Sequence, residues 1–128
     1  MSQRQMFLIV MGAITWFMAA MFIRLALPQG WLDGGAVTFA IFAASLPVAA
    51  SSIEFAHRLV KGARGHLMHT AAPICIVGLL LDGIAFVWAS KLYTANPSLL
   101  AAGGAWLLWT VGLTLAYASL RDARAAAA

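Results

Sequence analysis

Charged residues are scarce in this chain. Only 9% of its 128 residues are charged and 63% are hydrophobic, with a mean hydropathy of +0.90. A soluble domain carries charge on roughly a quarter of its residues, so this composition excludes an ordinary water-soluble globule and indicates a surface that faces lipid. The length fits one domain. We therefore expect a single all-α transmembrane domain over residues 1–128, an integral membrane four-helix bundle.

Cysteine is also scarce, and catalytic motifs are lacking. The single Cys75 excludes an intrachain disulfide and a Cys-x-x-Cys redox centre. Haem ligation would need two opposed histidines, for which His57 and His69 are the candidates. A metal pair would need His66 and His69, and no carboxylate or cysteine completes such a site. There is no nucleophile–base pair. We predict that the protein is not an enzyme and that it holds no cofactor and no metal.

Four apolar runs are long enough to cross a bilayer, which takes about 20 helical residues for a core of roughly 30 Å. They predict helices over about 6–27, 35–58, 71–92 and 97–120, joined by short connections that force antiparallel neighbours. The first run is longer than a signal-peptide core, so we expect it to be retained. The alanine-rich end after Arg124 predicts a frayed terminus.

The basic residues predict the orientation. With the N-terminus inside, six of them fall on the cytoplasmic side and two on the outer side. The inner set is Arg4, Arg58, Lys61, Arg64, Arg121 and Arg124, and the outer set is Arg24 and Lys91. Trp31, Trp88 and Tyr93 then fall at the outer interface, where aromatic side chains are favoured. This clustering at helix ends indicates contact with lipid head groups rather than nucleic acid, and both termini are predicted to be cytoplasmic.

Asp82 lies at the centre of the third run. A charged aspartate there costs about 2.5–3.5 kcal/mol, so such residues face a bundle interior or water. Its helical neighbours are small, among them Cys75, Gly78, Ala85 and Ala89, which predicts an inward face. Two interpretations stay open. Asp82 is either a proton- or cation-coupled site or polar ligand anchor, or a structural carboxyl that is protonated or salt-bridged.

Two further charges lie within or near the predicted spans. Arg24 either reaches Asp82 through helix tilt or a bridging water, or extends outward to the interface. Glu54 is followed by Arg58 four residues later, which predicts an ion pair along one helix. The alternative is a proton relay from Glu54 to Asp82.

The other unusual residues at mid-depth are Pro47 and three tryptophans. Pro47 predicts a kink that frees the carbonyl of Ala43. Away from water each indole needs an acceptor, for which Asp82 and the Ala43 carbonyl are candidates. The tryptophans either pack the bundle or form a pocket around Asp82 for a cationic or planar ligand. They are Trp16, Trp106 and Trp109. Before Pro47, a stripe of Ala36, Ala40 and Ala44 predicts a helix contact.

Three short segments carry a family resemblance: Gly78-Leu79-Leu80-Leu81-Asp82, Asn96-Pro97 and Gly104-Ala105-Trp106-Leu107-Leu108-Trp109. In them the chain resembles a family of short four-helix bacterial membrane proteins of unknown function, mainly in its second half. The resemblance implies a bacterial inner-membrane location and points to Asp82, Asn96, Pro97 and Trp106. It implies no activity.

Two functions follow from these observations. The first is an accessory or structural membrane subunit that binds other helices, because polar chemistry is so sparse. The second is a small transporter with Asp82 as its proton- or cation-coupled site, which requires oligomerisation because four helices are too few to enclose a path. Both predict the lipid bilayer as surroundings and a homo-oligomer or a larger membrane complex.

Overall fold

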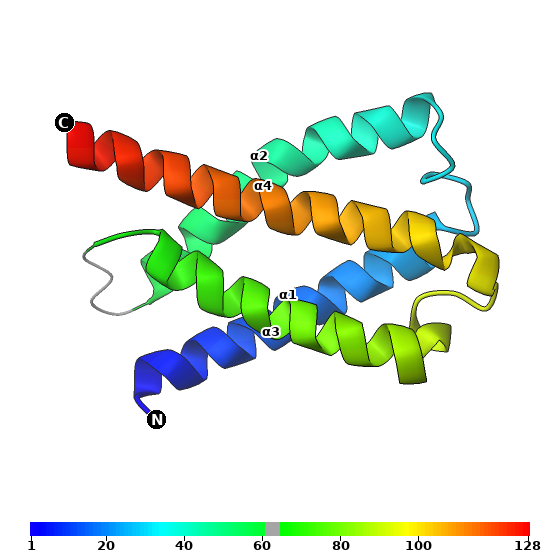
Figure 1. Ribbon diagram of the computed structural model, residues 1–128, viewed down its shortest axis with the longest axis horizontal. Helices are drawn as coiled ribbons and strands as arrows, with labels where there is room; N and C mark the ends of the chain where they lie inside the picture. Colours follow the sequence, from blue (N-terminus) through cyan, green and yellow to red (C-terminus); the bar gives the residue numbers. More distant parts are fainter. Residues whose placement is uncertain (61–64) are drawn as a thin grey trace.

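The computed structural model describes residues 1–60 and 65–128, and these ranges hold four long helices (Figure 1). They are α1 (Gln3–Ala26), α2 (Ala36–Leu59), α3 (Met68–Trp88) and α4 (Leu100–Ala127), with two short 3-10 helices, η1 (Ser90–Leu92) and η2 (Pro97–Leu99), between α3 and α4. Consecutive helices run antiparallel, and both termini lie at the same end of the bundle (Figure 1). This confirms the predicted all-α four-helix bundle.

All four of these helices are long and apolar enough to span a membrane, so the described part of the chain is a multi-pass membrane protein with four candidate spans. Their limits differ from the predicted ones for local reasons. α1 begins at Gln3 because Ser2 and Gln5 form a capping box, in which the Gln5 amide lies 3.2 Å from Ser2 Oγ. α3 ends at Trp88 because the chain turns into η1. α4 continues to Ala127, so the alanine-rich segment after Arg124 is the last turn of this helix.

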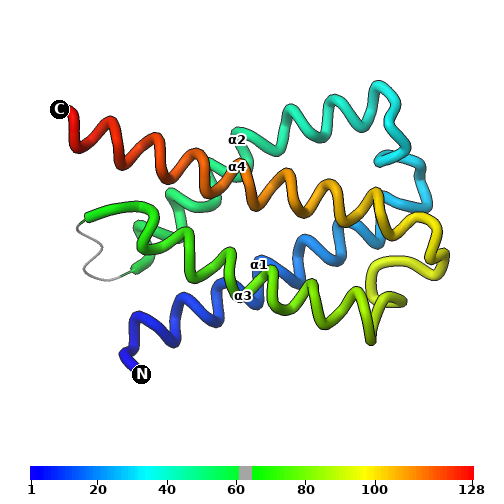
Figure 2. Tube along the Cα trace, in the orientation of Figure 1, coloured from blue at the N-terminus to red at the C-terminus, as the bar shows by residue number. Residues whose placement is uncertain are grey.

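The closest packing joins α1 to α3 and α2 to α4, and each of these pairs is parallel (Figures 1 and 2). α1 and α3 meet at Gly12. A Cβ atom at Gly12 would lie 2.8 Å from Cβ of Val77 and 3.1 Å from the carbonyl oxygen of Ile74. Glycine therefore permits this approach of the two backbones, as small residues commonly do in membrane bundles.

α2 and α4 are the least enclosed helices. α2 contains Pro47 without a break, and Figure 2 shows a change of direction within this helix. The stripe of Ala36, Ala40 and Ala44 is exposed on its outer face. The helix contact predicted for this stripe is therefore not made by the described residues of the chain.

Candidate functional site

Asp82 lies on α3 and faces α1, and two neutral side chains donate hydrogen bonds to one of its carboxylate oxygens. The indole Nε1 of Trp16 lies 2.9 Å from Oδ1, and the phenol of Tyr93 donates a hydrogen bond to the same atom. The Trp16 indole also lies 3.1 Å from the Tyr93 hydroxyl. Asp82 is 7% exposed, so its face is directed inward as its small neighbours predict. The predicted use of Asp82 as an indole acceptor is correct for Trp16.

Tyr93 is the residue of this cluster that the sequence analysis missed. The sequence predicts Tyr93 at the outer interface, and the structure shows that its side chain is fully buried within the bundle. The turn at η1 reverses the chain after α3, and the Tyr93 ring then stacks on Phe86 with ring centres 4.5 Å apart. Burial raises the pKa of the Tyr93 phenol above its ordinary value. The hydroxyl therefore stays protonated at neutral pH and serves as the donor to Asp82.

The second oxygen of Asp82 is chemically available. Oδ2 accepts no hydrogen bond from the described residues, whereas Oδ1 accepts two. Among those residues no polar side-chain atom is both fully buried and without a partner, so Oδ2 keeps contact with the surface of the bundle. One oxygen of Asp82 is thus used structurally and the other can accept a proton or a cation.

Arg24 does not bond to Asp82 and extends outward instead, which is the second of its two predicted alternatives. Its Nη1 donates to the carbonyls of Lys91 and Leu92, at 3.1 Å and 3.3 Å. These carbonyls belong to η1, beyond the end of α3, and a guanidinium compensates such groups well. Arg24 therefore holds the turn that carries Tyr93, and it contributes to the Asp82 cluster through that turn rather than through an ion pair.

Trp106 and Trp109 do not join Asp82, so of the two predicted alternatives these tryptophans pack the bundle and do not form a pocket around Asp82. Both indoles donate to α2: Trp106 to Ser45 Oγ at 3.1 Å and Trp109 to the Phe42 carbonyl at 3.0 Å. The acceptor for Trp109 is one residue before the predicted Ala43 carbonyl. These two tryptophans connect α4 to α2, whereas Trp16 connects α1 to α3.

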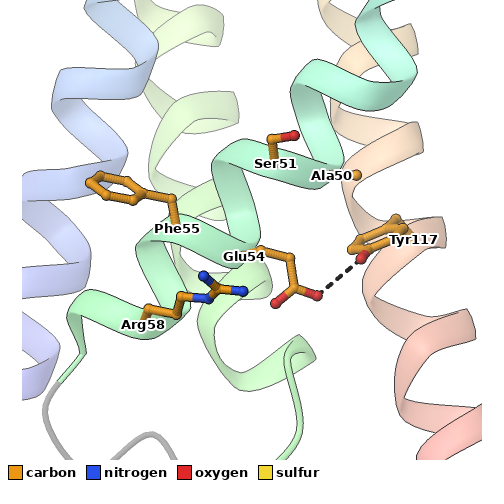
Figure 3. Close-up of a pocket in the computed structure, with 6 residues that line it drawn as sticks. All are labelled: Ala50, Ser51, Glu54, Phe55, Arg58 and Tyr117. Atoms are coloured by element: carbon orange, nitrogen blue, oxygen red, sulfur yellow. Dashed lines mark hydrogen bonds between the residues drawn. The ribbon is translucent and has the colours of Figure 1, made fainter.

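Glu54 lies in a groove between α2 and α4 (Figure 3). Its carboxylate accepts from Arg121 Nε at 2.8 Å and from the Tyr117 hydroxyl at 2.9 Å, both on α4. The predicted ion pair with Arg58 is therefore wrong. Sequence spacing could not reveal the competing partners, because they come from a helix more than sixty residues away.

Asp122 and His57 are two further polar contacts of the bundle. Asp122, near the end of α4, accepts from the backbone amides of Leu67 and Met68 at 2.7 Å and 2.9 Å. It thereby caps α3, which has no capping side chain of its own. Nδ1 of His57 lies 2.7 Å from Oγ1 of Thr70, and both residues are buried. His57 therefore bonds to α3 through Thr70.

The ends of the bundle differ in charge. Arg4, Arg58, Arg121 and Arg124 lie at the end with the two termini, where α1 begins and where α2 and α4 finish (Figure 1). Arg24 and Lys91 lie at the other end. The predicted residues Lys61 and Arg64 lie outside the described part of the chain.

Comparison with family models, with curated proteins and with solved structures finds no match to this chain.

Proposed function

We propose that this protein is an accessory or structural membrane subunit that binds transmembrane helices of other subunits through the outer faces of α2 and α4. The observation that carries this proposal is the position of the small residues. In the described part of the chain each of these two helices has a row of small residues that face away from the bundle, where only lipid or another protein can contact them.

The outer face of α2 carries a row of small residues along most of its length. Ala36, Ala40, Ala44, Pro47 and Ser51 are three or four residues apart, and all are exposed. Helices associate in membranes where small residues let backbones approach and where hydroxyl groups can bond across the contact. Ser51 supplies such a hydroxyl.

α4 presents a second face of the same kind. Ala101, Ala105, Gly112, Ala116 and Ser119 lie on one side of this helix and are exposed. Because α2 and α4 pack against each other, these two faces can meet one partner together. We call them the small-residue faces.

The outward face of α3 provides a contrast. It carries large aliphatic side chains, which suit contact with lipid chains: Ile76, Leu80, Ile84 and Val87 are all more than half exposed. α2 and α4 also expose large side chains, among them Phe39 and Leu108, but they carry the rows of small residues as well. These rows support a protein partner on that side of the bundle and lipid against α3.

The proposal includes an orientation and a membrane. The end with the termini carries more basic residues than the opposite end, which supports a cytoplasmic position for both termini under the positive-inside rule. The family resemblance in Gly78–Asp82 and Gly104–Trp109 is the support for a bacterial inner membrane.

Native mass spectrometry from a mild detergent tests this function. We expect the wild type to appear as a complex with a second copy or with a larger subunit. Ala40→Leu should release it as a single chain, because the added bulk separates the helices. Ile84→Phe adds bulk to the lipid-facing side of α3 and should leave the complex intact. A wild type that is a single chain, or equal loss in both variants, would contradict the proposal.

The open oxygen of Asp82 favours a second candidate function, an oligomeric transporter coupled to a proton or cation. In this case Asp82→Asn should abolish proton-coupled flux in liposomes, since an amide side chain does not gain and lose a proton as a carboxyl does. Trp109→Phe, which removes a donor away from Asp82, should leave flux unchanged. Absence of flux in the wild type would exclude this candidate and leave the first.

A further inference from the structure

The groove around Glu54 is the smaller of two grooves that the described residues form near the end of the bundle that carries the termini, and unlike the other, which lies at Arg4, it is lined by a carboxylate. It has a volume of about 360 Å³ and opens between α2 and α4 (Figure 3). Its lining combines charged, hydroxyl and apolar side chains: Ala50, Ser51, Glu54, Phe55, Arg58 and Tyr117. A ligand with both a polar and an apolar part fits such a lining.

The acid in this groove is already neutralised. Glu54 accepts from Arg121 Nε at 2.8 Å and from the Tyr117 hydroxyl at 2.9 Å. Arg58 also lines the groove and is exposed, and it makes no ion pair with a carboxylate of the described residues. Figure 3 shows its guanidinium on the same side of α2 as Glu54. The guanidinium is therefore free to bind an anion from outside the chain.

The surrounding charge is positive. Among the described residues, the charged ones near the groove are three arginines, Arg58, Arg121 and Arg124, and two acids, Glu54 and Asp122. The Asp122 carboxylate accepts hydrogen bonds from the amides of Leu67 and Met68 at the start of α3. An anionic ligand is therefore favoured over a cationic one. Guanidinium groups suit phosphate in particular, because they donate two parallel hydrogen bonds to its oxygens.

The depth of the groove indicates where this phosphate comes from. Arg58 lies one residue before the end of α2 at Leu59, which is roughly 1.5 Å along the helix axis at 1.5 Å per residue. That position corresponds to the head-group region of a bilayer spanned by α2. Phe55 and Ala50 add apolar surface beside the charges.

We propose that the groove between α2 and α4 binds an anionic phospholipid, with Arg58 contacting its phosphate and Ala50 contacting the start of an acyl chain. The groove shares Ser51 with the small-residue face of α2, whereas Arg58 and Ala50 lie outside both small-residue faces. It makes the polar end of α2 and α4 a specific lipid site rather than a general basic surface.

The test measures lipid binding to the full chain in mild detergent by native mass spectrometry. The probes are phosphatidylglycerol, phosphatidylcholine and glycerol 3-phosphate. We expect phosphatidylglycerol to bind more tightly than phosphatidylcholine and glycerol 3-phosphate to bind weakly. Arg58→Gln should weaken phosphatidylglycerol binding about tenfold, the loss expected for one charge-assisted contact. Ala50→Leu should weaken it by filling the groove, and it provides the test if Arg58→Gln does not fold.

Arg4→Gln is the matched control, because Arg4 carries the same charge at the same end of the bundle but lies on α1, away from the groove. It should change binding less than twofold. The proposal fails if Arg4→Gln weakens binding as much as Arg58→Gln, because binding would then reflect diffuse charge. It also fails if phosphatidylcholine binds as tightly as phosphatidylglycerol, or if glycerol 3-phosphate binds as tightly as the lipid.

Discussion

Trp16 in α1 and Asp82 in α3 are joined by a hydrogen bond of 2.9 Å between residues 66 positions apart in the chain. The bond crosses the pair of parallel helices that pack most closely, about one turn beyond their contact at Gly12. Tyr93 donates to the same carboxylate oxygen from the turn after α3. One buried aspartate thus connects two helices and a loop.

Loss of the Trp16 indole should weaken the bundle. Trp16→Phe keeps most of the ring volume and removes the donor to Asp82. We expect the free energy of unfolding in detergent to fall by about 1–2 kcal/mol, the upper range for hydrogen bonds between membrane helices. Trp109→Phe removes an indole donor at a partly exposed position and should cost less. A larger loss for Trp109→Phe than for Trp16→Phe would contradict the role of the Asp82 cluster.

Gly12 and Gly83 should respond in opposite directions to alanine. Gly12→Ala places a Cβ atom 2.8 Å from Cβ of Val77, and overpacking of this kind costs about 1–3 kcal/mol. Gly83 has no neighbouring atom within 4 Å of the same position, so Gly83→Ala should be neutral or stabilising through helix propensity. Thermal unfolding of both variants in one detergent checks this. Equal midpoints would show that α1 and α3 do not meet at Gly12.

The partner of Glu54 can be established by double-mutant cycles. The contact of 2.8 Å with Arg121 predicts a coupling free energy of about 0.2–1 kcal/mol between Glu54→Gln and Arg121→Gln, since both side chains are partly exposed. The cycle of Glu54→Gln with Arg58→Gln should give a smaller coupling. Unfolding free energies of the single and double variants supply both values, and the reverse order would restore the pair expected from sequence spacing.

Asp122 should protect the start of α3. Asp122→Ala leaves the amides of Leu67 and Met68 without their acceptor, and loss of a helix cap costs about 0.5–2 kcal/mol. Hydrogen exchange of the first turn of α3 should accelerate, while exchange in the middle of α3 should change little. Arg124→Ala alters a charge on the same exposed segment without touching α3, and it should leave that exchange as in the wild type.

Periodicity and composition were sufficient to predict the four helices and the inward face of Asp82. Apolar length identifies a span, and small neighbours identify the side on which another helix lies. The acceptor for Trp16 was also predictable, because few polar groups are available at that depth. The helices and the face of Asp82 depend on local sequence, and the acceptor for Trp16 depends on the cost of an unpaired indole N–H away from water.

The contacts that were not predicted depend on how distant segments meet. Tyr93 reaches Asp82 only because η1 reverses the chain, and Glu54 pairs with Arg121 because α2 packs on α4. The outward direction of Ala36, Ala40 and Ala44 likewise depends on the rotation of α2 within the bundle. Helix periodicity defines which residues share a face, but the packing of the other helices decides which way that face points.

Cysteine crosslinking in native membranes tests the central claim, the binding of another helix by the outer face of α2. The one native cysteine, Cys75, is buried, so Ala40→Cys introduces a single exposed thiol, and Ile84→Cys does the same on the lipid-facing side of α3. With a maleimide that carries a photoreactive benzophenone, which inserts into C–H bonds of any neighbouring protein, we expect Ala40→Cys to give an adduct larger than one chain and Ile84→Cys to give none. No adduct at Ala40→Cys, or equal adducts at both positions, would contradict the account.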